Sequence, residues 1–243
     1  MLCQLAIIIL AIGIIFGLIS SCREEEPLKG AEFEPVMLGK PITFRHGTYE
    51  DIYMGITFSV YVPDHVTLDN SPIVMAFPST PGSHNPVREL FKAVADGIEG
   101  ILMVPNIQYT YDPLLYAKFL DSLAMVPAIN PDKLIMGGYS SGAGTALYMN
   151  TVRPELIRGN ILLAPGRAVL ANEPSSEVSV LAKTCICTGD QDLAYDANQK
   201  LHEKLNSSGV TSKILVIPSY NHADMLSRNY TTEKLQCANF VLK

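Results

Sequence analysis

The stretch "KLIMGGYSSGAG", residues 133–144, decides the fold class because a buried strand, a sharp turn and a helix start follow one another within it. The apolar run before Tyr139 predicts a strand, and the small residues after it favour a tight turn. Gly138 and Gly142 flank Ser140 in the pattern G-x-S-x-G, which bends the backbone without side-chain clashes. Ser140 is therefore a candidate nucleophile, whereas Ser141 lies outside the central position.

A glycine-serine turn that only packs or binds phosphate is the competing interpretation. The sequence after Ser140 lacks the G-K-[ST] ending of a P-loop, and the pattern G-x-G-x-x-G is absent from the chain. Nucleotide binding is therefore the weaker hypothesis for this turn.

Outside the turn, short apolar runs alternate with longer segments of helical period, which predicts an α/β fold with a mostly parallel sheet flanked by helices. Strands are expected at 42–46, 56–62, 72–77, 100–105, 133–138, 160–165, 184–189 and 213–218, and helices at 85–98, 112–126, 141–152, 194–208 and about 231–242. The first two strands alternate in polarity and predict an antiparallel edge, while the later runs are continuous, as in strands buried on both faces. We expect about eight strands and no cap domain.

Composition restricts the classes of partner and cofactor. The 243 residues are 48% hydrophobic and carry a formal net charge of −6, with no cluster of Lys and Arg. Nucleic acid is therefore not an expected partner. No spacing of Cys and His resembles a zinc site, so neither a metal nor another cofactor is expected.

The N-terminus differs in composition from the rest of the chain. Residues 1–22 carry no charged side chain, and their apolar run is shorter than a membrane span needs, which predicts a signal peptide over 1–21. The stretch Ile19-Ser20-Ser21-Cys22 resembles a bacterial lipobox, in which Cys22 would be lipidated and would tether the protein to a membrane. Residues 22–41 then form a flexible tether to a domain over 42–243.

This N-terminus implies export. We expect a lipoprotein of the outer membrane or cell surface, with a periplasmic or secreted protein, or a retained N-terminal anchor, as alternatives. The membrane is expected as a partner only through that lipid or anchor.

Three cysteines lie in the predicted domain. Cys185 and Cys187 share one face of a predicted strand and cannot bridge each other. Buried free thiols are expected, and pairing of one of the two with Cys237 is the alternative.

A serine nucleophile needs a histidine to accept its proton and a carboxylate to orient that histidine. The strand at 184–189 is followed by Asp190 and Asp192, and the strand at 213–218 is followed by His222. Parallel sheets assemble their sites at the carboxyl ends of their strands, so these loops are expected to meet near Ser140.

At this point the chain resembles the α/β-hydrolase superfamily over about residues 42–242. The stretch "INPDKLIMGGYSSGAG" is especially similar to its esterase-like branches, and the pattern G-x-x-D at Gly189–Asp192 implies that Asp192 is the triad acid, with Asp190 as the alternative.

The resemblance also implies two backbone donors for a tetrahedral oxyanion. One is the N–H of Ser141, and the other belongs to the loop after the strand at 72–77. Because Pro78 has no N–H, Ser79 or Thr80 is expected to supply it. His84, further along this loop, is a candidate for lining the pocket.

The sequence thus predicts a serine carboxylic-ester hydrolase that uses Ser140, His222 and Asp192 and forms an acyl-enzyme. An open pocket without a cap favours short acyl groups or esters linked to carbohydrate. A peptidase or amidase with the same triad is one alternative. A hydrolase-like surface protein that binds glycans without catalysis is the other.

Overall fold

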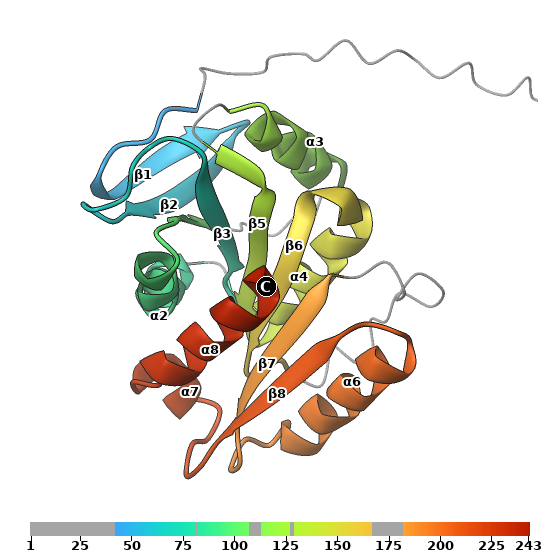
Figure 1. Ribbon diagram of the computed structural model, residues 1–243. Coiled ribbons are helices and arrows are strands. Elements are labelled where there is room, and N and C mark those ends of the chain that lie inside the picture. Colours follow the sequence, from blue (N-terminus) through green and yellow to red (C-terminus); the bar gives the residue numbers. More distant parts are fainter. Residues whose placement is uncertain (1–41, 81, 107–112, 127–128, 167–181) are drawn as a thin grey trace, which may run out of the picture. The chain divides into compact units, whose positions relative to one another are not determined.

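The computed structural model describes residues 42–80, 82–106, 113–126, 129–166 and 182–243. These residues contain an eight-stranded sheet in the order β1-β2-β4-β3-β5-β6-β7-β8 (Figure 1). The strands are β1 (Gly47–Tyr53), β2 (Ile56–Val62), β3 (Ser71–Phe77), β4 (Ile101–Pro105), β5 (Ile129–Tyr139), β6 (Ile157–Leu163), β7 (Lys183–Gly189) and β8 (Ser212–Ile217). All pairings among β3 to β8 are parallel. The predicted α/β architecture is confirmed.

The antiparallel edge is also where the sequence prediction is partly wrong. β1 pairs antiparallel with β2, and β2 pairs antiparallel with β4, as expected. However, the strand predicted at 42–46 is absent, and β1 runs over Gly47–Tyr53 instead. β1 is an edge strand whose residues alternate between half-buried and exposed, so it has few apolar side chains to mark it in the sequence. The turn at Met54 and Gly55, both with positive φ, fixes the hairpin of β1 and β2.

Helices cover both faces of the sheet. One layer contains α2 (His84–Gly97), the short α7 (Asp224–Ser227) and α8 (Thr231–Leu242), and the other contains α3 (Pro113–Ala124), α4 (Ser141–Val152) and α6 (Tyr195–Ser207) (Figure 1). A 3₁₀ turn, η1 (Pro154–Leu156), precedes β6. Each layer buries its own apolar cluster against the sheet. The five predicted helices are confirmed to within two residues at most ends, and α7 is additional.

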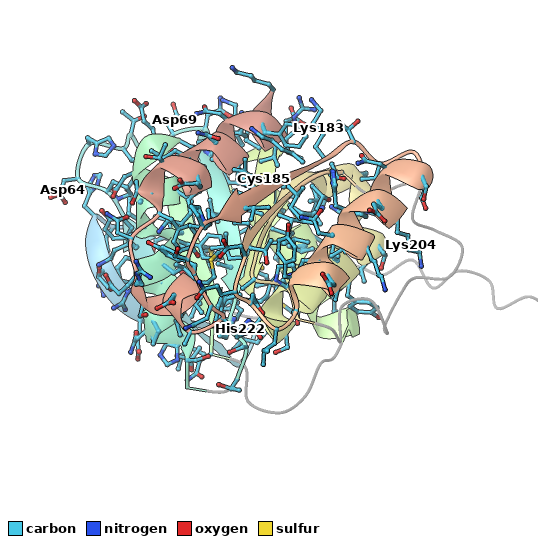
Figure 2. The ribbon with its side chains drawn as sticks, turned by 90° about the horizontal axis from the view of Figure 1, so that it is seen from below. Asp64, Asp69, Lys183, Cys185, Lys204 and His222 are labelled. Carbon is cyan, nitrogen blue, oxygen red and sulfur yellow. A yellow bond between two sulfur atoms is a disulfide. The ribbon has the colours of Figure 1, made fainter. Side chains whose placement is uncertain are left out.

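The contact between α8 and its neighbours combines a buried cation with a disulfide. Lys234 is almost fully buried and its Nζ donates to the carbonyl of Leu90 on α2, at 2.8 Å. On the sheet side, Cys237 of α8 is bonded to Cys185 of β7 (Figure 2). The expectation of free thiols is therefore wrong for this pair, because the segment between β8 and α8, which contains α7, returns the chain so that Cys237 lies over the face that Cys185 shares with Cys187.

The third cysteine lies beside this bond. Cys187 is a buried free thiol whose Sγ is 3.4 Å from the Sγ of Cys237. Burial raises the pKa of the Cys187 thiol to about 12. The thiol therefore stays protonated and packs as a small apolar group.

Several sequence predictions fall outside the described residues, namely the signal peptide at 1–21, the tether at 22–41 with Cys22, and the helix start at Asp112. Within the described ranges, no helix has the length and apolar character that a membrane span requires. The same ranges contain no group of three Cys, His, Asp or Glu side chains placed to hold a metal ion.

Replacing Cys237 with Ser should lower the free energy of unfolding by about 2–4 kcal/mol, because the disulfide joins positions 52 residues apart and restricts the unfolded chain. Urea denaturation followed by circular dichroism measures this. Cys237 is the informative position, since Cys187 lies close enough to replace Cys185. Cys187→Ala is the control and should cost only about 1 kcal/mol. Equal stability of Cys237→Ser and wild type, both without reductant, would contradict the expectation.

Candidate active site

Ser140 occupies the strained turn that the glycine pattern predicted. It directly follows β5 and has φ 54° and ψ −123°, a backbone conformation that residues with a side chain rarely adopt. A Cβ on Gly138 would collide with the carbonyl of Gly142, and a Cβ on Gly142 would collide with the carbonyl of Phe77. Only glycine fits at these two positions, and the first turn of α4 is thereby held against the end of β3.

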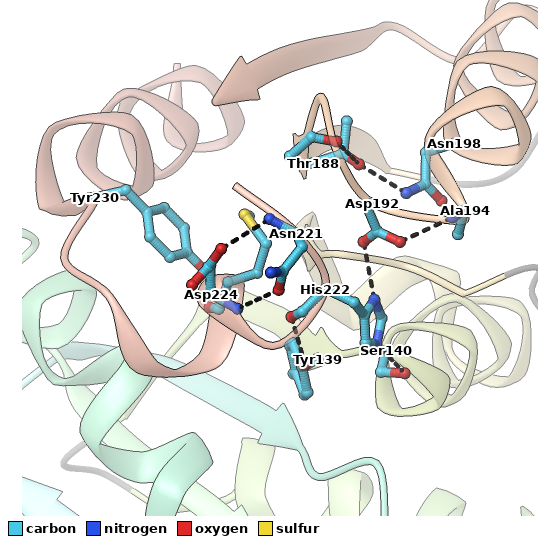
Figure 3. Close-up of polar contacts among 12 residues, drawn as sticks. Tyr139, Ser140, Thr188, Asp192, Ala194, Asn198, Asn221, His222, Asp224 and Tyr230 are labelled. Atoms are coloured by element: carbon cyan, nitrogen blue, oxygen red, sulfur yellow. Dashed lines mark hydrogen bonds and ion pairs between the residues drawn. The ribbon is translucent and has the colours of Figure 1, made fainter. Parts of the chain in front are cut away.

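His222 connects Ser140 to a buried carboxylate. Its Nε2 lies 2.9 Å from the Oγ of Ser140, and its Nδ1 lies 2.8 Å from Oδ2 of Asp192 (Figure 3). Because an ionised carboxylate only accepts hydrogen bonds, Nδ1 carries the ring proton and Nε2 is free to accept the serine proton. The Asp192 side chain is 1% exposed and its Oδ1 accepts from the N–H of Ala194 at 2.8 Å, whereas the His222 side chain is 37% exposed.

Asp190 lies in the same loop and has a different contact. Its Oδ1 accepts a hydrogen bond from the N–H of Ser219 at 2.7 Å, where Ser219 has a positive φ of 62°. The N–H of Gln191 also donates to the carbonyl of Tyr220, and a Cβ on Gly189 would collide with that carbonyl. The structure thus places Asp192 at the imidazole and uses Asp190 to join the acid loop to the histidine loop.

The short helix α7 holds the histidine loop in shape. The N–H of Asn221 donates to Oδ2 of Asp224, and the N–H of Asp224 donates to Oδ1 of Asn221, each at 3.0 Å (Figure 3). Arg228 closes the loop from the other end by donating to the carbonyl of Ser219. Helix α7 was not expected from the sequence. The reciprocal Asn-x-x-Asp spacing resembles a capping box and is the signal that identifies it.

The predicted oxyanion donors lie on two adjoining segments. Ser141 is the first residue of α4, and its hydroxyl donates to the carbonyl of Ser79 at 2.7 Å, which joins this helix start to the loop after β3. In that loop the N–H of Thr80 already donates to the hydroxyl of Ser83, at 3.2 Å. Because its N–H is engaged, Thr80 is a weaker candidate than Ser79.

Gly166 lies beside Ser140, whereas His84 contacts a residue of β1. A Cβ on Gly166 would lie 3.9 Å from the Oγ of Ser140, so the chain after β6 borders the side chain of Ser140. Sequence reasoning missed this glycine. His84, by contrast, is the buried first residue of α2, and its Nε2 lies 3.4 Å from Oε1 of Glu50 on β1.

Comparison of the sequence with known proteins gives no relative. No family model matches the chain, and no curated protein matches it. Solved structures match it well. A thermostable esterase from Pseudomonas putida aligns with a TM-score of 0.65 at 14% identity, over 82% of each chain. The chain has the α/β-hydrolase fold. An esterase from Pyrobaculum calidifontis aligns with a TM-score of 0.65 at 13% identity, over 86% of this chain and 88% of that one.

A fungal esterase from Rhizomucor miehei aligns with the same α/β-hydrolase core, with a TM-score of 0.61 at 12% identity over 80% of this chain and 81% of that one. The resemblance inferred from the G-x-S-x-G turn is thus confirmed at the level of the fold. Because one fold carries many chemistries, activity has to be argued from the side chains of the site.

Proposed function

We propose that this protein is a serine carboxylic-ester hydrolase. The observation that carries the proposal is the continuous hydrogen-bonded path from Ser140 through His222 to Asp192, starting from a strained backbone turn. Strain of this kind is retained where the surrounding structure enforces it, and it concentrates at functional sites. The esterase activity named for the structural neighbours supports the same reaction class.

The first half of the proposed reaction forms an acyl-enzyme. The Oγ of Ser140 attacks the ester carbonyl carbon while Nε2 of His222 takes the hydroxyl proton. The buried carboxylate of Asp192 stabilises the imidazolium that results. His222 then donates this proton to the alcohol oxygen as the carbon–oxygen bond of the ester breaks.

In the second half, water replaces the alcohol. Nε2 of His222 accepts a proton from the water, whose oxygen attacks the acyl carbon, and the proton returns to Oγ of Ser140 as the acid leaves. The half-exposed imidazole supports this step because solvent reaches it directly.

The negative oxygen of each tetrahedral intermediate is stabilised by the backbone N–H groups of Ser141 and Ser79 in this proposal. Ser141 lies at the N-terminus of α4, where the helix dipole favours negative charge. Its hydroxyl bond to the carbonyl of Ser79 holds the two donor segments together. Donors that are already in place need no reorganisation when the charge develops.

For substrates, we propose short acyl esters or esters linked to carbohydrate. The partial exposure of the His222 side chain supports an open site that accepts a bulky alcohol. Gly166 supports the same view, since the absence of a side chain leaves space beside the Oγ of Ser140. A peptidase or amidase with this triad, or a surface protein that only binds glycans, is supported by no specific contact.

We further propose that the protein is exported and tethered through a lipid on Cys22. The Cys185–Cys237 disulfide supports export, because disulfides persist in oxidising compartments and are rare in the reducing cytosol.

Replacing Ser140 with Ala should lower kcat for p-nitrophenyl acetate by at least about 10³-fold, because the nucleophile is lost while the fold remains. It should also abolish labelling by a fluorophosphonate probe. Circular dichroism provides the control for folding. Labelling that persists in the variant would refute the assignment, and a folded wild-type protein that is neither labelled nor active would favour the glycan-binding alternative. Faster turnover of aminoacyl amides than of short esters would favour the peptidase alternative.

The two aspartates should differ sharply in the same assay. Asp192→Asn removes the charge that orients and stabilises the imidazolium, and kcat should fall by about 10³–10⁴-fold. Asp190→Asn keeps an oxygen that accepts from the N–H of Ser219, so its kcat should stay within roughly threefold of wild type. The reverse ranking of the two variants would make Asp190 the triad acid.

Lipidation is tested in a bacterial host that processes lipoproteins. Incorporation of an alkyne palmitate into the wild-type protein should disappear in Cys22→Ala, because Cys22 supplies the thiol and the N-terminal amine that carry the lipid chains. Cys3→Ala, which alters a cysteine inside the predicted signal peptide, is the matched control and should keep the label. Labelling of Cys22→Ala, or none of the wild type, counts against a lipid on Cys22.

A further inference from the structure

We propose that Tyr139 is a positioning residue that fixes the backbone of the catalytic base against the nucleophile. This inference rests on the proposed hydrolase function. Tyr139 is the last residue of β5, and its hydroxyl donates to the carbonyl oxygen of His222 at 2.8 Å (Figure 3). Tyr139, which precedes Ser140 in the chain, therefore contacts the main chain of His222, the residue that must accept the proton of Ser140.

The aromatic ring of Tyr139 adds a second contact. Its centroid lies 5.3 Å from that of the His222 imidazole, with the planes inclined at 35°. The phenol bond thus restrains the backbone of His222, while the ring packs beside its side chain. Together they limit both translation of the loop and tilt of the imidazole.

The protonation state of Tyr139 suits this role. Tyr139 is 5% exposed, and burial together with the nearby charge of Asp192 raises the pKa of its phenol to about 12. A raised pKa keeps the phenol protonated at every pH below that value. The hydroxyl therefore remains a donor throughout the pH range in which His222 can act as a base.

The other braces of the loop act at different residues. Asp190 holds Ser219, Asp224 holds Asn221, and the hydroxyl of Tyr230 donates to the carbonyl of Met225 at 2.6 Å. Of these contacts, only the Tyr139 bond reaches the backbone of His222 itself. A displacement of about 1 Å at that point is enough to weaken proton transfer strongly.

Tyr230 provides a matched control. Tyr139→Phe and Tyr230→Phe each delete one hydroxyl group. Each of these hydroxyls donates to a backbone carbonyl in the segment formed by the histidine loop and α7. The variants are compared by thermal unfolding, by steady-state turnover of p-nitrophenyl acetate, and by the rate constant of fluorophosphonate labelling. The final amplitude of labelling counts the folded enzyme, so the rate constant remains meaningful even if part of a variant is unfolded.

In Tyr139→Phe, kcat and the labelling rate constant should both fall about tenfold, with KM changed by less than about twofold. Tyr230→Phe should lose similar thermal stability but keep both rates within about twofold. If both hydrogen bonds served only to stabilise the fold, a fall in kcat without a change in KM would not be expected in one variant alone.

Equal rates in the two variants, or unchanged rates in Tyr139→Phe, would overturn the positioning role. If wild type itself is neither labelled nor active, the proposed function fails instead. The two failures are therefore distinguishable.

Discussion

The close approach of α4 to the end of β3 is the constraint on which the site depends. With no side chain at Gly142, the helix start reaches the carbonyl of Phe77, and with none at Gly138 the preceding strand reaches the same turn. Ser140 is thereby forced to a positive φ and projects above the carboxyl edge of the sheet. The same approach brings the N-terminus of α4 beside the loop that contains Ser79, so one steric condition positions both the proposed nucleophile and its proposed oxyanion donors.

The parts of the site that could be predicted from the sequence were those with local signals. A buried strand followed by G-x-S-x-G identifies the turn at Ser140 because the glycines and the apolar run lie within a few residues of one another. The choice between Asp190 and Asp192 had no such signal, since both belong to one loop and only the packing of β8 and α7 separates them. The resemblance favoured Asp192, and Asp192 is the aspartate that contacts His222. The disulfide was only the alternative expectation for the same reason, because helix spacing does not reveal which strand Cys237 faces.

The side chains of Tyr139 and Ser141 make contacts that the motif G-x-S-x-G does not specify. In G-x-S-x-G the positions beside the serine are unspecified, yet here each contacts a distant loop, at separations of 83 and 62 residues. Tyr139 contacts the histidine loop, and the Ser141 hydroxyl contacts the loop after β3. These bonds depend on how far each loop extends beyond its strand, which hydrophobic periodicity does not record. The turn at Ser140 is therefore the point at which the histidine loop and the loop after β3 are joined.

The packing of α8 on β7 affects how fast the disulfide can exchange partners. Cys187 lies within van der Waals reach of the disulfide, yet exchange requires a thiolate, and burial keeps this thiol protonated. The Cys185–Cys237 pairing is thus protected because water is excluded from the core, and not because the Cys187 sulfur is far away. A fluctuation that admits water between α8 and β7 removes the burial that raises the pKa of this thiol, so that a small fraction ionises and can form the alternative pair with Cys237. The rate at which the disulfide exchanges partners would consequently measure how often α8 separates from β7. The three sulfur atoms therefore report local unfolding of this helix.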